Sequence, residues 1–187
     1  MSIKKRKQLR LRKYDYSCNG AYFVTICTQD KSNVFGKINN GEITHNPAGH
    51  EIIRICRDLP QFCSGLEIDE FVVMPNHLHI VFILNNKDVV AGLRACPHDI
   101  TTEESQTLNK TTLPDVLYQF KSWTTKIYSD GVKKMGWKPY PKKLWQRNYY
   151  ERVVRDDAEL NRIREYIINN PFNWDKDNEN PETNQNG

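Results

Sequence analysis

The sequence holds 187 residues, with a hydrophobic fraction of 38%, a charged fraction of 27% and a formal net charge of +4. This length suits one domain with a real core and is too short for two comfortable ones, and the composition is that of a soluble globular protein. No run of eighteen apolar residues occurs and no apolar stretch follows the basic N-terminus, so we expect neither a membrane span nor a secretory signal. A cytoplasmic protein is therefore the expectation.

Residue patterns along the chain predict alternating strands and helices. β-Branched and aromatic runs indicate strands, Asn40-Gly41 indicates a tight hairpin turn, and a proline opens each of the first two helices. Asp156 and Glu159 form a capping box for the last helix. In chain order we expect a strand over 20–28, a hairpin over 34–45, a helix from Pro47, strands over 66–74 and 77–84, a helix from Pro114 to about Ser129, a strand around 149–154, and a last helix from Asp156 to Pro171.

This order predicts an α+β fold with a ferredoxin-like antiparallel sheet, packed helices and an extra C-terminal helix. The strand over 77–84 is apolar on both faces apart from two histidines, so we expect it to be central and covered on each side. Residues 85–112 lose periodicity and gather polar side chains, which indicates a surface insertion. We therefore divide the chain into a basic arm over 1–13, a single domain over 14–174 and an acidic tail over 175–187 that we expect to be disordered.

Basic side chains gather in two places, although the net charge is modest. Residues 4–13 hold seven of them and no acid, and a second cluster between residues 133 and 147 is interleaved with tryptophan and tyrosine. Basic groups bind phosphate and aromatic rings stack on unpaired bases, so two clusters favour nucleic acid, although each alone also fits a solvated lysine face. The candidate DNA-binding residues are Lys4, Lys5, Arg6, Lys7, Arg10, Arg12, Lys13, Lys142, Lys143, Trp145 and Arg147.

His77 and His79 are two residues apart on a predicted strand. Side chains alternate between the faces of a strand, so both imidazoles point the same way and can reach one cation. Two satisfied or exposed histidines would give the same spacing, but a pair on a central strand beside the Pro75-Asn76 turn needs partners if it is buried. The pair is therefore a candidate metal site.

Tyr166 and Asn170 are four residues apart on the last helix and share one face of it. By helix geometry Tyr166 lies about 90° from the centre of the apolar stripe, at the margin of the buried face, where a tyrosine often only packs. Pro171 disfavours the α conformation for the residue before it, so we expect the Asn170 side chain to swing away from the helix line. A C-cap role for Asn170 is the alternative.

Several segments resemble a known family. Met74–Phe82 reads MPNHLHIVF, which is similar to the His–hydrophobic–His motif of the HUH single-tyrosine transposases. The segments YDYSCNGAYFVTICT, QFKSWTTKIY, and WQRNYYERVVRDD followed by YIINNP resemble the REP-associated tyrosine transposase branch in particular. The resemblance covers roughly residues 12–175 without the insertion, and the histidine motif combined with the last block is highly specific.

The resemblance implies an enzyme with a metal centre. His77 and His79 match the two metal-binding histidines, Tyr166 matches the nucleophile and Asn170 matches a third metal ligand. The implied reaction cleaves and rejoins single-stranded hairpin DNA through a 5′-phosphotyrosine, with Mg²⁺ or Mn²⁺ on the scissile phosphate. Either a monomer or a homodimer fits the family.

Two other functions stay open. A non-catalytic module could hold hairpin DNA or RNA on the same scaffold, although such a protein would be expected to have lost a histidine or the tyrosine. A metal-dependent nuclease or phosphodiesterase could use activated water, with Tyr166 structural. Tyr149 or Tyr150 could contact DNA, whereas Cys96 and His98 in the insertion fit an incidental pair better than a metal site.

Overall fold

The computed structural model describes residues 19–86, 111–140, 142–181 and 183, so the basic arm and most of the insertion lie outside it. Within these residues, no helix has the length and apolar character that crossing a bilayer requires. The strands and α-helices, in chain order, are β1 (Gly20–Cys27), β2 (Gly36–Asn39), β3 (Glu42–His45), α1 (Pro47–Asp58), β4 (Leu66–Val73), β5 (His77–Leu84), α2 (Leu113–Met135), β6 (Tyr150–Val154) and α3 (Asp157–Asn169).

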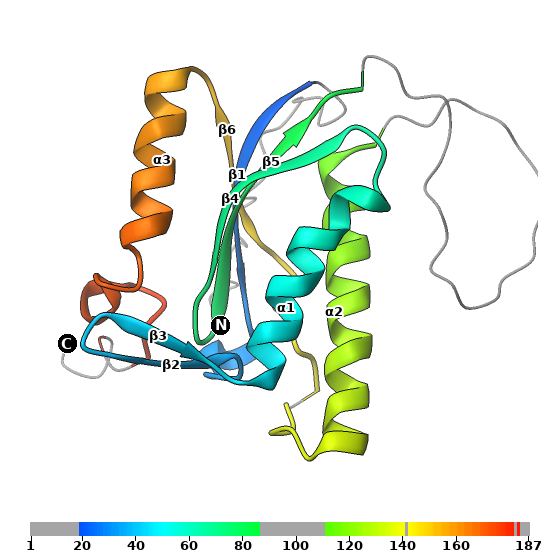
Figure 1. The fold of residues 1–187 in the computed structure, drawn as a ribbon, viewed down its shortest axis with the longest axis vertical. Helices are drawn as coiled ribbons and strands as arrows, with labels where there is room; N and C mark the ends of the chain where they lie inside the picture. Colours follow the sequence, from blue (N-terminus) through cyan, green and yellow to red (C-terminus); the bar gives the residue numbers. More distant parts are fainter. Residues whose placement is uncertain (1–18, 87–110, 141, 182, 184–187) are drawn as a thin grey trace, which may run out of the picture.

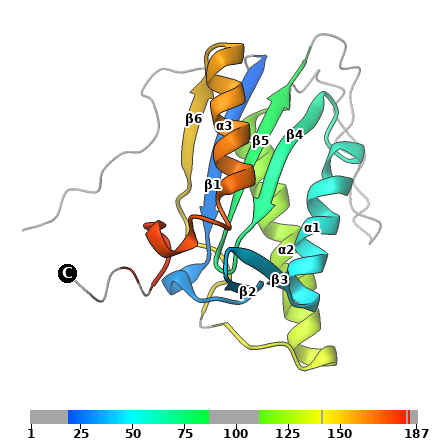
Figure 2. The ribbon, with the colours of Figure 1, turned by 60° about the vertical axis from the view of Figure 1, so that its left-hand side comes forward.

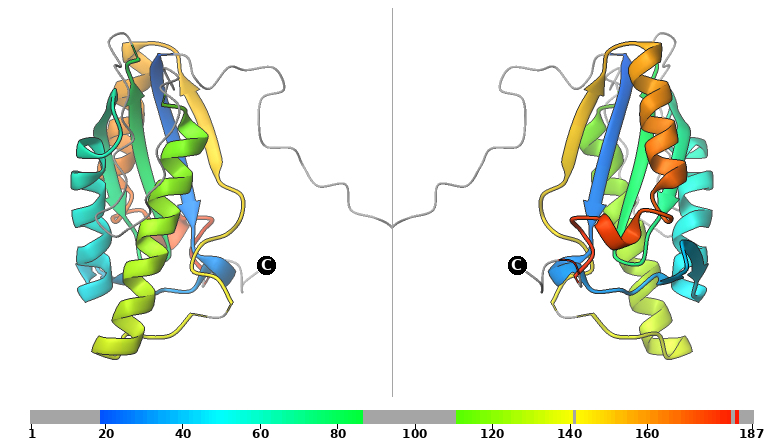
Figure 3. Two further views of the ribbon diagram at one scale, coloured as in Figure 1. Left: turned by 90° about the vertical axis from the view of Figure 1, so that its right-hand side faces the viewer. Right: turned by 90° about the vertical axis from the view of Figure 1, so that its left-hand side faces the viewer.

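Four strands form one antiparallel sheet in the order β4-β5-β1-β6, and β2 and β3 form a separate hairpin. α1 and α2 cover one face of the sheet, and α3 lies on the other face (Figure 1; Figure 2). Figure 3 shows the faces in turn, with α2 in front of the sheet in one view and α3 in front in the other. This arrangement confirms the predicted α+β, ferredoxin-like sheet with an extra C-terminal helix.

β5 is the central strand that its apolar pattern predicts, because it pairs with β4 on one side and with β1 on the other. Leu78 and Ile80 belong to the main core beneath α1 and α2. The alternating residues His77, His79 and Val81 face the opposite side, where Val81 packs in the smaller cluster under α3. The strand therefore delivers both histidines to the layer between the sheet and α3.

α3 is held over this layer by an apolar contact and an ion pair. Ile163 and Ile167 pack in the cluster that includes Phe23 of β1. The Arg164 guanidinium makes two hydrogen bonds to the Asp69 carboxylate of β4, at 2.8 and 2.5 Å. Such a fork fixes direction as well as distance, so it sets how the helix crosses the sheet.

The helix ends follow the expected capping rules, with one difference in length. The Asp156 side chain accepts a hydrogen bond from the Glu159 main-chain N–H at 2.7 Å, as the capping pattern predicts. α2 continues past Ser129 to Met135, and Gly136 then ends it in the left-handed conformation with φ of 68°. The extra turns carry the chain to the start of the basic segment.

Trp145 lies in the core, so the prediction that it contacts DNA is wrong. Its side chain is 5% exposed, and its indole Nε1 donates a hydrogen bond to Thr124 Oγ1 at 2.8 Å. The indole packs against Phe35 and Phe120, with ring centroids 5.2 and 5.8 Å away. A ring that the core covers in this way cannot stack on a base.

Replacing Trp145 by alanine is therefore expected to unfold the protein more easily. Loss of the buried ring should lower the free energy of unfolding by about 3–5 kcal/mol, measured by urea denaturation. The control is Lys143→Ala at an exposed position in the same segment, which should change it by less than about 0.5 kcal/mol. A Trp145→Ala protein of normal stability would contradict this assignment to the core.

Candidate metal centre and tyrosine site

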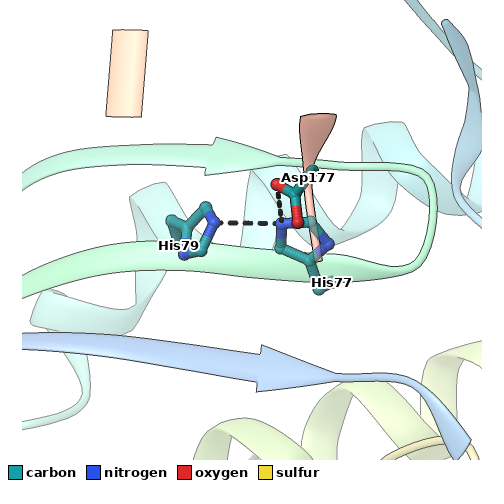
Figure 4. Close-up of side chains that lie close together, drawn as sticks. All are labelled: His77, His79 and Asp177. Atoms are coloured by element: carbon teal, nitrogen blue, oxygen red, sulfur yellow. Dashed lines mark hydrogen bonds and ion pairs between the residues drawn. The ribbon is translucent and has the colours of Figure 1, made fainter. Parts of the chain in front are cut away.

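His77 and His79 meet in a buried space on the α3 side of the sheet (Figure 4). Their Nε2 atoms are 3.0 Å apart, and the side chains are 0% and 3% exposed. The predicted spacing therefore does bring the two rings together. The pair is held inside the protein and does not lie on its surface.

Asn76 fixes which nitrogen of His77 carries a proton. Asn76 Nδ2 donates to the main-chain carbonyls of Lys31 and Glu179 at 3.0 and 2.7 Å, so Oδ1 is the atom that lies 2.8 Å from His77 Nδ1. An amide oxygen only accepts, so His77 Nδ1 donates and Nε2 keeps its lone pair. Histidines that bind metals are oriented in this way, through the nitrogen that does not touch the metal.

The His79 ring is also fixed through its Nδ1 atom. Thr25 Oγ1 lies 2.8 Å from His79 Nδ1, and the ring stacks on Phe23 with centroids 5.5 Å apart. The His77 ring stacks on Trp174 at 6.1 Å. Each imidazole is thus held by its Nδ1 and by an aromatic neighbour, and both Nε2 atoms point to one space.

Burial lowers the pKa of both His77 and His79 to about 3. At His77 the Asn170 amide works against this effect and Lys31 adds to it. At His79 the neighbouring His77 adds to it and the Asp177 carboxylate opposes it. Both rings are therefore neutral at physiological pH, which is the state in which an imidazole binds a metal.

Asp177 brings an oxygen atom to the cluster, and the Asn170 amide lies close enough to act on the pKa of His77. Asp177 Oδ2 lies 3.8 Å from His77 Nε2, and the ligand atoms of Asp177 and the two histidines all lie within 4.8 Å of one another. Asp177 Oδ2 and Asn170 Oδ1 are buried, and neither accepts a hydrogen bond from any described residue. Unpaired buried acceptors are costly, and a cation between them would remove that cost.

The donor set fits a divalent ion. Two neighbouring ligands of an octahedral ion, each about 2.1 Å from it, are about 3.0 Å apart. The Nε2 atoms of His77 and His79 are separated by 3.0 Å. Two neutral imidazoles with carboxylate and amide oxygens suit several divalent metals, so the cluster could bind a metal without specifying which one.

Tyr166 reaches the same cluster from α3. Its hydroxyl oxygen lies 3.3 Å from His79 Nε2, and its ring stands edge-on to His79 and Phe23. The side chain is 48% exposed, so it lies at the margin of the buried face as predicted. Burial raises the pKa of the hydroxyl, Asp177 raises it further and the Asn170 amide lowers it, so the phenol is protonated at neutral pH.

Asn170 stays on the helix line, so the expected swing away from it does not occur. Its φ of −59° and ψ of −41° are helical although Pro171 follows. It is the C-cap residue of α3, and its buried side chain acts on the pKa of both His77 and Tyr166. The two alternatives for Asn170 are therefore compatible: its backbone caps the helix while its amide lies in the site.

Residues after α3 return across the site, which the sequence did not indicate. The segment passes a short 3₁₀ turn at Trp174–Lys176 and reaches Asp177. Lys31 holds it by a hydrogen bond to the Asn178 carbonyl at 2.7 Å and an ion pair with Glu179 at 3.2 Å. The described part of the tail is thus ordered against the domain, unlike the expected disordered tail, and it supplies an acidic ligand candidate.

The remaining DNA-binding candidates fall into two groups. The seven residues of the basic arm lie outside the described residues. Lys142, Lys143 and Arg147 are exposed. The segment that carries them is hydrogen-bonded to the last residue of β1, because Gln146 N donates to the Cys27 carbonyl at 2.9 Å. Cys27 pairs with His77 in the sheet, so this contact lies near the histidine pair.

Known proteins resemble this chain in sequence and in fold. No family model matches the chain. A protein of Haemophilus influenzae described as "Uncharacterized protein" is 34% identical over 94% of this chain and 93% of its own length. Another from that organism, "Putative REP-associated tyrosine transposase", is 26% identical over 84% of this chain and 73% of its own length.

A solved structure shares the fold. A REP-associated tyrosine transposase bound to a REP hairpin has a TM-score of 0.51 and 17% identity, over 87% of this chain and 72% of that one. The antiparallel sheet agrees with the fold of that structure, and the paired histidines and the helix-borne tyrosine are the residues that carry the resemblance to the HUH single-tyrosine transposases. The chain is thus similar in sequence to a putative REP-associated tyrosine transposase, and it shares the fold of a solved structure of that kind.

Asn76→Ala is expected to weaken Mn²⁺ binding by about 10- to 100-fold, because His77 then loses the acceptor that fixes its tautomer. Asn76→Asp keeps an acceptor for His77 Nδ1 but loses the amide donor to the Lys31 and Glu179 carbonyls, so it should also weaken binding. Isothermal titration of the purified protein measures both. Asn33→Ala, at an exposed position, is the control, and equal affinity for all variants would contradict the role of Asn76.

The metal-free protein should lose stability as the pH falls from 7 to 5. The unfolded imidazoles take up protons near pH 6.5, whereas the folded pair, with pKa values of about 3, stays neutral, so the unfolded state binds more protons. The loss is on the order of 1 kcal/mol per histidine per pH unit below 6. Urea denaturation in EDTA measures it, and a His77→Asn/His79→Asn double variant should show a flatter dependence. Equal slopes would contradict the neutral pair.

Proposed function

We propose that this protein cleaves and rejoins single-stranded DNA at hairpin-forming repeats through a 5′-phosphotyrosine on Tyr166. The observation that carries the proposal is the Tyr166 hydroxyl, which lies 3.3 Å from His79 Nε2 and close enough to Asp177 and Asn170 for both to act on its pKa. A tyrosine that served only to pack the helix would not need metal-ligand atoms at its hydroxyl. The transposase relatives support the same class of activity.

His77 and His79, with Asp177, Asn170 or both, would hold the divalent ion, Mg²⁺ or Mn²⁺. When bound, the ion would supply positive charge to a nonbridging oxygen of the scissile phosphate. The chain's own part is to keep both imidazoles neutral and oriented before DNA arrives. Burial and the contacts of Asn76 and Thr25 achieve this.

Tyr166 would form a bond to phosphorus while the bond from phosphorus to the 3′ oxygen breaks. The tyrosine hydroxyl gives up its proton, and the departing 3′ oxygen takes one up as a 3′-OH. Attack by the 3′-OH of another strand end reverses both changes, so joining needs no external energy. The raised pKa of Tyr166 means that the hydroxyl needs the cationic site beside it to become a nucleophile at neutral pH.

The scaffold limits how far Tyr166 can move. Ile163 and Ile167 fix α3 on the sheet, and Arg164 ties it to β4. The tyrosine therefore approaches the phosphate from a rigid helix, which keeps the loss of freedom in the reacting complex small.

A single-stranded hairpin is the proposed partner, because the related transposase of known structure is bound to a REP hairpin. The exposed Lys142, Lys143 and Arg147 can bind phosphates beside the end of β1. We propose that the basic arm over 4–13 adds further phosphate contacts. The protein then acts on DNA in the cytoplasm, as a monomer or a homodimer.

Tyr166→Phe should abolish a covalent protein–DNA product and leave hairpin binding within about twofold. The ring that packs on Phe23 remains, and only the nucleophilic oxygen is lost. A denaturing gel measures the product, using end-labelled hairpin oligonucleotides from repeats that flank the gene, with Mg²⁺ or Mn²⁺.

Tyr118→Phe is the matched control, because Tyr118 is 79% exposed on α2 and lies outside the site. It should give the wild-type amount of covalent product. Cleavage that survives Tyr166→Phe would contradict the nucleophile, and tight binding without any covalent product in the wild type would favour a binding module.

A further inference from the structure

A cavity of about 490 Å³ opens beside the metal cluster and Tyr166. His79, Tyr166 and Asp177 form the part of its wall that adjoins the proposed phosphate site. Its volume lies within the range of about 300–1,000 Å³ that is common for small-molecule pockets. The proposed cleavage uses His79, Tyr166 and Asp177 of this lining, and it gives no role to Tyr150, which also lines the cavity.

Tyr150, at the start of β6, also lines the cavity. In the sheet, His79 pairs with Thr25, and Thr25 pairs with Tyr150, so the three lie in one row across β5, β1 and β6. Paired residues point to the same face, which places Tyr150 on the α3 side with His79. Two strand spacings separate them, about 10 Å.

Tyr150 is exposed in a way that suits stacking. It is 48% exposed, and it meets Phe23 edge-on with ring centroids 6.4 Å apart. An edge contact leaves a ring face without an aromatic partner. Tyr166, which the proposed cleavage already uses, is equally exposed and also lines the cavity, whereas the other strongly exposed rings among the described residues, Tyr118 and Phe172, do not.

The segment after α3 lines the cavity with polar groups. They include Asn173, Lys176 and Asn178, together with the carboxylates of Asp177 and Glu179, of which Glu179 is paired with Lys31. Asn173 Nδ2 donates to the Asn169 carbonyl at 3.0 Å, so its Oδ1 is the atom that the amide offers to a ligand. Aromatic walls with amides and a lysine at the rim match a nucleobase, which has π faces, a hydrogen-bonding edge and an attached phosphate.

We propose that this cavity is a nucleobase pocket, in which Tyr150 stacks on the unpaired base of a nucleotide next to the scissile phosphate. The inference rests on the proposed function, which places that phosphate between the histidines and Tyr166. A base bound in this pocket holds the attached scissile phosphate at a fixed position relative to the Tyr166 hydroxyl. Tyr150 thus contributes to DNA binding and also to the selection of the phosphodiester bond that is cleaved.

The test combines variants of Tyr150 with abasic DNA. Fluorescence anisotropy measures the Kd of the full-length protein for a hairpin oligonucleotide with a single-stranded flank. One abasic nucleotide is moved stepwise along that flank, so the measurement does not depend on cleavage. The proteins are wild type, Tyr150→Ala, Tyr150→Phe and the control Tyr118→Ala, each checked for an unchanged melting temperature.

At one flanking position the abasic change should weaken wild-type binding by about 5- to 150-fold, the range for one stacked base. Tyr150→Ala should weaken binding of intact DNA similarly and lose nothing more at that abasic position. Tyr150→Phe and Tyr118→Ala should behave as wild type. Independent, multiplicative losses at every position, or no effect of Tyr150→Ala, would overturn the pocket.

The covalent product, scored in the same reactions, separates this inference from the proposed function. A Tyr166-dependent product without coupling between Tyr150 and any base would overturn the pocket alone. Coupling without a covalent product would overturn the cleavage reaction and leave a pocket that binds a base. Absence of hairpin binding by the wild type would overturn both.

Discussion

The Nε2 atoms of His77 and His79 lie 3.0 Å apart in the interior of the protein, and the rest of the site depends on this pair of neutral imidazoles. Burial keeps them unprotonated, and the Nδ1 contacts to Asn76 and Thr25 decide how the rings are turned. Two nitrogen lone pairs at this distance repel each other unless a proton or a cation lies between them. The unpaired oxygens of Asp177 and Asn170 lie around the same space, so a divalent cation satisfies more of these atoms than a proton would.

Two features of the fold bring the histidine pair and Tyr166 together. A central strand covered on both sides puts its alternate residues under α3, and α3 carries a tyrosine at the edge of its apolar face. The chain after α3 then comes back over the histidines and is tied to Lys31 and Asn76. Because Asn76 contacts both His77 and the Glu179 carbonyl, the orientation of the His77 ring and the position of the returning segment are coupled.

The sequence predicted what depends on local rules. Period-two and helical patterns placed the strands, the histidine pair and Tyr166 correctly, because neighbours along a strand or helix settle those faces. Asp177 and Asn76 were missed because their roles depend on a chain reversal that brings segments far apart in sequence together. Trp145 was misassigned because its basic neighbours resemble a DNA-binding loop, whereas its packing partners are distant in sequence. Asn170 kept its helical conformation because one residue at a helix end can tolerate a following proline.

The most direct test of the metal centre is a crystal structure of the protein soaked in Mn²⁺, with anomalous data. A metal at the proposed site should give one strong anomalous peak about 2.1 Å from the Nε2 atoms of both His77 and His79. An oxygen of Asp177 or Asn170 should complete the contacts, with the Tyr166 hydroxyl beside the ion. A peak elsewhere, or two histidines that keep their direct contact in saturating Mn²⁺, would contradict it.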